Sequence, residues 1–273
     1  MQTRIISILN QKGGSGKTTT AINVASGWAR LLAQKNRTVQ SRVLLLDIDP
    51  QASATAVILG LETAVGPRRR GEPNIYEVVL QRASATAAIK RVSLEPTTHL
   101  PGAPLDILPS HLELFKAENE LISIYQRERQ LRKALQAEQL PYDVIIIDCP
   151  PSLGVLTLNA LTASTEVVIP VDPGVFPLIG LNMLKDIIYM IQADNTGLRI
   201  GGVIPTMNDR TVLARDTQAQ LEDGFGGLVL QPVPRRVAVG EAHAEGIDLY
   251  LSAPDSDAAE AYLEITRRLM NHE

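Results

Sequence analysis

A glycine-rich segment near the start of the chain constrains its fold more than any other feature. The segment reads NQKGGSGKTT over residues 10–19, directly after the apolar run 5–9. Over residues 20–35, apolar side chains recur at helical spacing, so the pattern predicts a buried strand, a tight turn and a helix. Glycines let backbone N–H groups turn inward, and a helix N-terminus carries about half a positive charge. The sequence therefore predicts a loop that binds phosphate groups.

Two side chains of this loop have expected roles toward a bound nucleoside triphosphate. Lys17 is placed to reach the β- and γ-phosphates, and the Thr18 hydroxyl is placed to bind Mg²⁺. We therefore expect Lys17 to take part in catalysis and Thr18 to be a metal ligand. The residues expected to hold the phosphates are Lys12, Gly13, Gly14, Ser15, Gly16, Lys17, Thr18 and Thr19.

The loop departs from the plain Walker A pattern at its first position. Gln11 stands where that pattern has glycine, and a further lysine, Lys12, lies near the loop entrance. By itself, Lys12 could be an ordinary surface lysine. However, the order Lys-Gly-Gly-x-Gly-Lys-Thr resembles the loop of the deviant Walker A ATPases of the ParA/MinD type. In that family the extra lysine crosses a dimer interface to the partner's ATP, so the resemblance implies a catalytic role in trans for Lys12.

The composition narrows the class of protein. The chain has 273 residues, of which 45% are hydrophobic and 4% aromatic, and its single cysteine, Cys149, permits no internal disulfide. The net charge of -4 argues against a globally basic nucleic-acid coat, but it leaves room for a local basic patch. The start of the chain lacks a signal-peptide cleavage site, and no apolar run approaches the roughly 20 residues that span a bilayer. We expect a soluble, cytoplasmic protein.

Apolar runs alternate with helical patterns along the whole chain. Continuous apolar runs are typical of parallel strands that are buried on both faces. The alternation predicts one domain over residues 1–273, an α/β fold with a doubly wound, mostly parallel sheet flanked by helices, as in P-loop NTPases. Strands are expected at 5–9, 42–47, 105–109, 142–148, 166–171, 198–205 and 228–230. Helices are expected at 20–35, 74–83, 85–91, 111–138, 153–163, 178–193, 212–223, 237–245 and 256–270, with an exposed loop over 62–73.

Two further strand ends carry carboxylates. The sequence reads DIDPQ over residues 47–51 and VIIIDCPPS over residues 144–152. Because ligands bind beyond the carboxyl ends of an open parallel sheet, both segments are expected beside the phosphate loop. Asp148 ends a buried strand and can hold a Mg²⁺-bound water, since Mg²⁺ prefers oxygen ligands. This segment resembles a Walker B strand followed by the family's Asp-x-Pro-Pro switch.

The segment 47–51 resembles the family's Asp-x-Asp-Pro-Gln switch. The resemblance implies that Asp49 orients the attacking water and that Asp47 supports the Mg²⁺ shell. In phosphoryl transfer the protein mostly positions groups and neutralises charge, so one carboxylate suffices to align water. Two structural alternatives stay open: Asp49 could cap a helix over 51–60, and Asp47 could be purely structural.

Two late segments are candidates for binding the base. Residues 205–210 read PTMNDR and resemble the family's Thr-Met-x-Asp segment. In relatives, the equivalents of Met207 and Asn208 lie near the adenine, and Pro234 falls in the second stretch that flanks it. The Asn-Lys-x-Asp pattern that reads guanine is missing from the sequence. We therefore expect ATP, with Mg²⁺, rather than GTP.

The resemblance extends from residue 5 to about residue 246 and is closest to the short ParA/Soj-type proteins. It implies a homodimer that forms with ATP, binds DNA without sequence preference, and is released when a ParB-like partner stimulates hydrolysis. It also implies plasmid or chromosome segregation at the nucleoid. The candidate DNA contacts are Arg210, Arg215, Arg235 and Arg236, although an arginine taken alone is more often an ordinary surface charge. Ala238 stands where relatives carry an arginine, which leaves the DNA contacts open.

The sequence also bears on three other function classes. A MinD-like membrane regulator needs a basic amphipathic C-terminal helix, whereas acidic residues outnumber basic ones over 255–268, so membrane binding is not expected. A metabolic enzyme is disfavoured because a single cysteine does not supply the paired cysteines of the superfamily's reductases, and no ligase motif is evident. A positioning ATPase for a protein cargo or organelle remains the alternative.

Overall fold

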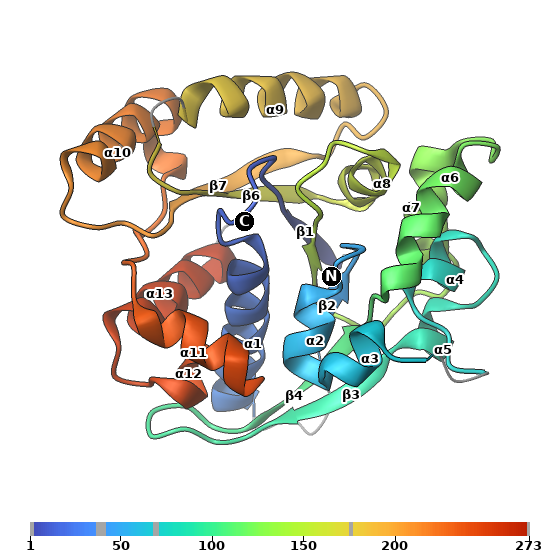
Figure 1. Ribbon diagram of the computed structural model, residues 1–273, viewed down its shortest axis with the longest axis horizontal. Coiled ribbons are helices and arrows are strands. Elements are labelled where there is room, and N and C mark those ends of the chain that lie inside the picture. Colours follow the sequence, from blue (N-terminus) through green and yellow to red (C-terminus); the bar gives the residue numbers. More distant parts are fainter. Residues whose placement is uncertain (1–2, 37–41, 68–70, 175–176, 272–273) are drawn as a thin grey trace.

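A mostly parallel, seven-stranded sheet forms the centre of the computed structural model, which describes residues 3–36, 42–67, 71–174 and 177–271 (Figure 1). The strand order is β3-β4-β2-β5-β1-β6-β7, and β3 alone among these strands runs antiparallel to its neighbour. This confirms the predicted doubly wound α/β fold. The strands are β1 (Arg4–Ile8), β2 (Val43–Asp47), β3 (Lys90–Leu94), β4 (Ala103–Leu108), β5 (Val144–Asp148), β6 (Glu166–Val171) and β7 (Arg199–Pro205).

The central strands are buried along their whole length. Every residue of β2, β5 and β6 is buried, which matches their continuous apolar runs. Asp148 of β5 lies opposite Ile8 of β1 on one side and opposite Asp47 of β2 on the other side. The last residues of β1, β2 and β5 therefore meet at one edge of the sheet, as expected from the sequence.

Helices cover both faces of the sheet and enclose two apolar cores (Figure 1). One core is formed with α1 (Lys17–Asn36), α2 (Ser53–Leu59), α11 (Val237–Glu245), α12 (Leu249–Ser252) and α13 (Asp257–Asn271). The other is formed with α4 (Ile75–Val79), α5 (Ala85–Ala88), α6 (Phe115–Leu121), α7 (Gln130–Ala137), α8 (Val155–Ala163), α9 (Pro177–Gln192) and α10 (Val212–Phe225). Short 3₁₀ turns lie at Leu112–Leu114, Arg127–Arg129 and Gly226–Leu228.

The long helix predicted over residues 111–138 is wrong. The segment contains a 3₁₀ turn, α6, a second 3₁₀ turn and α7 in succession. Gln126 has a φ of 55°, in the left-handed region that a continuing helix does not use. Three large apolar side chains of this segment, Phe115, Ile122 and Tyr125, are 66%, 63% and 83% exposed. The apolar side chains of this segment therefore do not form one buried helical face.

Three further expectations are corrected. The helix predicted over 85–91 ends at Ala88, because Lys90–Leu94 pairs with β4 as an edge strand whose side chains alternate between half-buried and exposed. The loop predicted over 62–73 begins as helix α3 (Leu61–Val65), while Arg68–Arg70 lie outside the described residues. The strand predicted over 228–230 is reduced to one bridge between Val203 and Val229.

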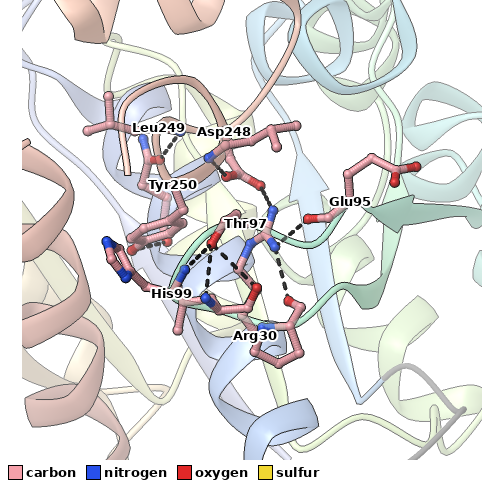
Figure 2. Close-up of polar contacts among 11 residues, drawn as sticks. Arg30, Glu95, Thr97, His99, Asp248, Leu249 and Tyr250 are labelled. Carbon is pink, nitrogen blue, oxygen red and sulfur yellow. Dashed lines mark hydrogen bonds and ion pairs between the residues drawn. The ribbon is translucent and has the colours of Figure 1, made fainter. Parts of the chain in front are cut away.

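A buried ion pair ties helix α1 to distant parts of the chain (Figure 2). Arg30 is fully buried, and its Nη2 donates to Asp248 Oδ2 at 2.8 Å. Its Nη1 donates to the carbonyl oxygens of Glu95 at 2.7 Å and Pro101 at 3.1 Å. A buried charge is costly unless it is paired and hydrogen-bonded, and Arg30 has both kinds of partner. The helix that begins at the phosphate loop is thereby held against the β3–β4 connector and the segment before α12.

Candidate functional site

The glycine-rich segment forms a tight loop between β1 and α1. Gly14 and Gly16 have φ values of 74° and 86°, which side-chain-bearing residues rarely adopt. Helix α1 begins at Lys17, three residues earlier than the pattern predicted, so Lys17, Thr18 and Thr19 form its first turn. The first N–H groups of a helix have no partner within the helix, and here they open onto the loop. The local backbone thus has the form of an anion-binding cradle.

Lys17 lies across this loop. Its Nζ donates to the Lys12 carbonyl oxygen at 3.0 Å, and only 7% of the residue is exposed. Burial lowers the pKa of Lys17, while the charges of Asp148 and Asp49 oppose the decrease. The ammonium is therefore partly desolvated, and an anion bound in the loop would favour its charged form.

Asp47 and Asp148 are both fully buried on adjacent strands, and they differ in their hydrogen bonding. Asp47 accepts hydrogen bonds from Thr55 N and Thr55 Oγ1, both at 2.8 Å, and from Asp49 N at 3.1 Å. Neither oxygen of Asp148 has a partner within hydrogen-bond distance and angle among the described residues, although the Thr18 side chain is close enough to lower the pKa of Asp148. Burial raises the pKa of Asp47 to about 7, and burial with the neighbouring Asp47 raises the pKa of Asp148 well above its usual range.

The orphaned oxygens of Asp148 fit a magnesium site. Buried polar atoms are rarely left without a partner, and Mg²⁺ with its bound waters would provide one. Thr18 belongs to the same site, because its side chain opposes the increase in the pKa of Asp148. The hydroxyl oxygen of Ser15 in the loop is likewise buried without a partner among the described residues. A hydroxyl and a carboxylate are ligand types that Mg²⁺ accepts, so Thr18 and Asp148 fit the ion.

The contacts of Asp47 favour its structural alternative. Its carboxylate oxygens bind the backbone N–H and the hydroxyl of Thr55 in the first turn of α2, which fixes the start of that helix. Helix α2 begins at Ser53 after Ala52, whose φ is 52°. Asp49 is therefore not the residue that caps this helix, and that alternative is wrong. Support of the Mg²⁺ shell by Asp47 stays a prediction.

Asp49 lies between the phosphate loop and the segment that follows β4. Its Oδ1 accepts from Gln51 N at 2.8 Å, and its carbonyl oxygen accepts from Ser110 Oγ at 2.7 Å. Burial raises the pKa of Asp49, and both the Gln51 hydrogen bond and the charge of Lys17 oppose that increase. The Asp49 carboxylate is therefore held in place near Lys17, and its role in orienting the attacking water stays a prediction.

Lys12 lies at the outer rim of the loop. Its side chain is 57% exposed and forms an ion pair with Asp172, which directly follows β6. The loop entrance is also tied to β6, because Asn10 Nδ2 donates to the Pro170 carbonyl oxygen at 2.6 Å and Asn10 Oδ1 accepts from Lys12 N at 3.0 Å. Lys12 is thus oriented outward, whereas Lys17 is oriented into the site.

A pocket of about 330 Å³ opens beside the phosphate loop. Two of the three residues predicted to bind the base, Met207 and Pro234, line it. Asn208 does not line it, but its backbone N donates to the Val233 carbonyl oxygen at 2.9 Å and so positions the pocket wall. The lining residues are Gly16, Thr19, Thr206, Met207, Val233, Pro234, Arg235, Arg236, Val239, Gly240, His243 and Tyr262. The sequence interpretation missed the contributions of α11 and α13, since no local motif marks them.

The four arginines predicted to contact DNA are all exposed. Arg236 forms an ion pair with Asp257 at the start of α13, and both side chains are about half exposed. Arg235 lines the base pocket, while Arg210 and Arg215 lie before and within α10. Exposed ion pairs stabilise a fold by about 0–1 kcal/mol, so the Asp257 contact leaves Arg236 able to exchange partners.

A phosphate-binding loop at the start of α1, with Lys17 oriented into it and two buried carboxylates at the neighbouring strand ends, defines a P-loop nucleoside triphosphatase. A protein-family model described as an AAA domain matches residues 3–200. The sporulation initiation inhibitor protein Soj of Bacillus subtilis (strain 168) is 40% identical over 269 residues, covering 97% of this chain and 98% of Soj. The chromosome partitioning protein ParA of Caulobacter vibrioides is 37% identical over 276 residues, with coverage of 99% and 95%. The chain belongs to the ParA/MinD family of P-loop ATPases.

Solved structures are consistent with this assignment. The crystal structure of cobyrinic acid a,c-diamide synthase from Mycobacterium smegmatis matches with a TM-score of 0.75 and 31% identity, covering 99% of this chain and 96% of that one. That protein holds an ATP analogue and magnesium, which agrees with ATP and Mg²⁺ as the cofactors of this ATPase. None of the described helices is both long and apolar enough to cross a bilayer.

Proposed function

We propose that this ATPase forms a homodimer with ATP, binds DNA without sequence preference, and segregates a plasmid or chromosome at the nucleoid. In this proposal a ParB-like protein stimulates hydrolysis and releases the dimer from DNA. The observation that carries it is the orientation of Lys12, which lies at the rim of the loop with 57% of its side chain exposed. A second copy facing this rim would receive that ammonium. The names of the relatives Soj and ParA support the partition role.

In this proposal each residue of the site has a separate role in ATP hydrolysis. Lys17 exchanges the Lys12 carbonyl oxygen for phosphate oxygens, which are stronger acceptors because they are charged. Thr18 and Asp148 would hold Mg²⁺, which neutralises charge on the phosphates. Asp49 orients the water that attacks, with its carboxylate held in place by Gln51 N. Asp47 keeps this segment attached to α2 through Thr55.

The DNA-binding surface would be built from Arg210, Arg215, Arg235 and Arg236. Non-specific binding comes from neutralised phosphates and typically reaches a Kd of about 10⁻⁴ to 10⁻⁶ M. A few arginines on a chain with a net charge of -4 are too few for stable retention by a monomer. A dimer presents the patch twice and increases avidity without any new contact. This provides a physical reason for binding to depend on ATP.

The similarity to a diamide synthase supports one further candidate, an ATP-dependent amide-forming enzyme. Such an enzyme needs a pocket for a carboxylic acid next to the γ-phosphate. Partition is favoured because Soj is more similar, at 40% against 31% identity, and covers nearly the same length. A positioning ATPase for a protein cargo or organelle stays the alternative function. It would use the same cycle of ATP binding and hydrolysis.

Cosedimentation with DNA tests the proposal. Purified protein is spun with plasmid DNA in ATP, in ADP and without nucleotide, over a series of salt concentrations. We expect retention in ATP alone, with weaker retention as salt increases because counterions are released on binding. Lys17→Ala serves as the matched control that lacks nucleotide contact. Equal retention in all three conditions would contradict the dependence of DNA binding on ATP, and no retention in ATP would contradict the DNA-binding role itself.

Dimer formation is tested separately by light scattering. Lys12→Ala should retain ATP binding, measured by calorimetry, but lose the dimer that wild type forms with ATP. If the variant dimerises as wild type does, Lys12 does not act in trans. Turnover that depends on an added carboxylic acid would instead favour the amide-forming enzyme.

A further inference from the structure

Ser110 follows the end of β4 and lies beside the segment that carries Asp49. Strands β2 and β4 are parallel neighbours, with Leu46 opposite Leu108. The chain continues past both of these residues in the same direction, which brings the segments after the two strands together. Ser110 is only 1% exposed. The end of β4 therefore contributes a buried hydroxyl to the edge of the sheet where the phosphate loop lies.

The side chain and the backbone of Ser110 bind two different parts of the segment after β2. Ser110 Oγ donates a hydrogen bond to the Asp49 carbonyl oxygen at 2.7 Å. Ser110 N donates to Thr55 Oγ1 at 2.8 Å, and that hydroxyl donates in turn to Asp47 Oδ2 at 2.8 Å. Ser110 is thus connected directly to Asp49 and, through Thr55, to Asp47.

The contact from Ser110 differs from the other hydrogen bonds of Asp49. Asp49 N donates to Asp47 Oδ1 at 3.1 Å, within the same turn of the chain. Gln51 N donates to Asp49 Oδ1 at 2.8 Å, and Ala52 N donates to the Asp49 carbonyl oxygen at 2.9 Å. These three bonds shape the turn but do not attach it to another part of the protein. Among the described residues, Ser110 is the hydrogen-bond donor that ties Asp49 to a different strand end.

The residues on both sides of Ser110 are themselves fixed. The carbonyl oxygen of Pro109 accepts a hydrogen bond at 3.0 Å from the backbone N of Ile75, the first residue of α4. His111 is 7% exposed, and its Nε2 donates to the Gly66 carbonyl oxygen at 3.0 Å. A hydroxyl on a fixed segment restricts the motion of the group that it binds. Ser110 is therefore suited to hold the backbone of Asp49 in one position.

We propose that Ser110 is a positioning residue for ATP hydrolysis, which holds the Asp49 carboxylate where it can align the attacking water. The inference rests on the proposed role of Asp49. The backbone position of Asp49 determines where its carboxylate lies, and a displacement of about 1 Å in a catalytic group can slow a reaction by about 100-fold. Since Ser110 is not part of the phosphate loop, its loss should lower turnover without changing the affinity for ATP.

The Ser110→Ala variant tests this role. It should stay folded, because the Asp49 carbonyl oxygen still accepts from Ala52 N. We expect single-turnover phosphate release to slow by about tenfold. The Kd for ATP, measured by calorimetry, should change by less than about twofold. Ser164→Ala is the matched control, since it removes another buried hydroxyl that donates to a backbone carbonyl oxygen, that of Ala160 at 2.8 Å. The control should hydrolyse ATP within about twofold of the wild-type rate.

A double-mutant cycle with Asp49→Ala separates positioning from a general effect on the structure. If Ser110 acts through Asp49, adding Ser110→Ala to Asp49→Ala should change the rate by less than about twofold. Wild-type turnover in Ser110→Ala, or the same loss in both backgrounds, would overturn the proposal. Wild-type turnover in Asp49→Ala would contradict the role of Asp49 and overturn this proposal with it.

A second variant keeps the test sharp if Ser110→Ala is unfolded by circular dichroism. Ser110→Cys places a weaker donor in a side chain of similar shape, so its turnover should lie between those of wild type and the alanine variant. Wild-type turnover in Ser110→Cys would overturn the proposal. Phosphate release is measured without DNA, so these outcomes are independent of the partition role.

Discussion

Lys12 and Asp172 form an ion pair between the rim of the phosphate loop and the end of β6, although 160 positions separate them in the sequence. Lys12 is more exposed than its partner, with 57% of its side chain accessible against 15%. The proposed role of Lys12 toward a second copy requires this pair to separate. The contact therefore opposes dimerisation by the free energy of one partly exposed ion pair, about 0–1 kcal/mol.

Asp172→Asn should consequently dimerise more readily. At saturating ATP we expect the dimer dissociation constant to decrease by roughly two- to fivefold, because Lys12 no longer exchanges one partner for another. Light scattering over a protein dilution series measures it. Asp186→Asn, which removes an exposed carboxylate from α9, controls for the change in net charge. A dissociation constant that increases in Asp172→Asn would show that Asp172 assists the dimer.

Asp49→Ala should separate ATP binding from hydrolysis. The variant keeps Lys17 and the loop, so its ATP affinity should stay within a few-fold of wild type. Turnover should decrease by roughly 100-fold or more, since the water loses the carboxylate that orients it. Phosphate release under single-turnover conditions measures the effect, with the exposed Asp255→Ala as a control. Hydrolysis at the wild-type rate would remove Asp49 from the mechanism.

The raised pKa of Asp148 predicts how the free energy of unfolding of the nucleotide-free protein depends on pH. Because burial raises the pKa values of Asp148 and Asp47, the folded protein keeps protons that the unfolded chain releases above pH about 4. The free energy of unfolding therefore falls as pH rises from about 4 through 7, because burial raises the pKa of Asp47 to about 7. Asp148→Asn should weaken this dependence and stabilise the nucleotide-free protein at pH 7.5 by about 1–3 kcal/mol.

Thermal unfolding of both proteins at several pH values checks this prediction. Asp106→Asn provides the contrast, because Asp106 is also buried but is paired with Arg91 and accepts from Tyr142 Oη at 2.9 Å. That variant should lose stability rather than gain it. If the free energy of unfolding of wild type and of Asp148→Asn changes with pH in the same way, the pKa of Asp148 is not raised in the folded state.

Arg30→Met should destabilise the fold strongly. The substitution leaves Asp248, which is 2% exposed, without its cation, and it orphans the carbonyl oxygens of Glu95 and Pro101. Breaking a buried pair in this way costs about 3–5 kcal/mol, equivalent to a decrease in Tm of roughly 10 °C. Differential scanning calorimetry measures it. Adding Asp248→Asn, which keeps a cap for α12, should recover part of the loss; a Tm unchanged in Arg30→Met would contradict the structural role.

Local sequence patterns determined the main elements of the fold and of the phosphate-binding loop. The run VIIID over residues 144–148 predicts a buried strand that ends in a carboxylate, since short continuous apolar runs rich in β-branched residues are typical of parallel strands buried on both faces. The glycines of the loop specify a tight turn, since two of them, Gly14 and Gly16, adopt positive φ values that other residues rarely adopt. The mostly parallel sheet, the cradle and the placement of Asp47 and Asp148 at the carboxyl edge of the sheet follow from such contiguous signals.

Tertiary structure decided the rest. Residues 111–138 carry apolar side chains at helical spacing, yet the segment breaks because Phe115, Ile122 and Tyr125 find no core to cover them. The base pocket joins the first turn of α1 to His243 and Tyr262, and the Lys12–Asp172 pair joins two strand ends. A sequence pattern indicates the backbone conformation of a few neighbouring residues. These contacts depend instead on which strands lie side by side in the sheet. The pocket and the ion pair therefore became visible only in the folded chain.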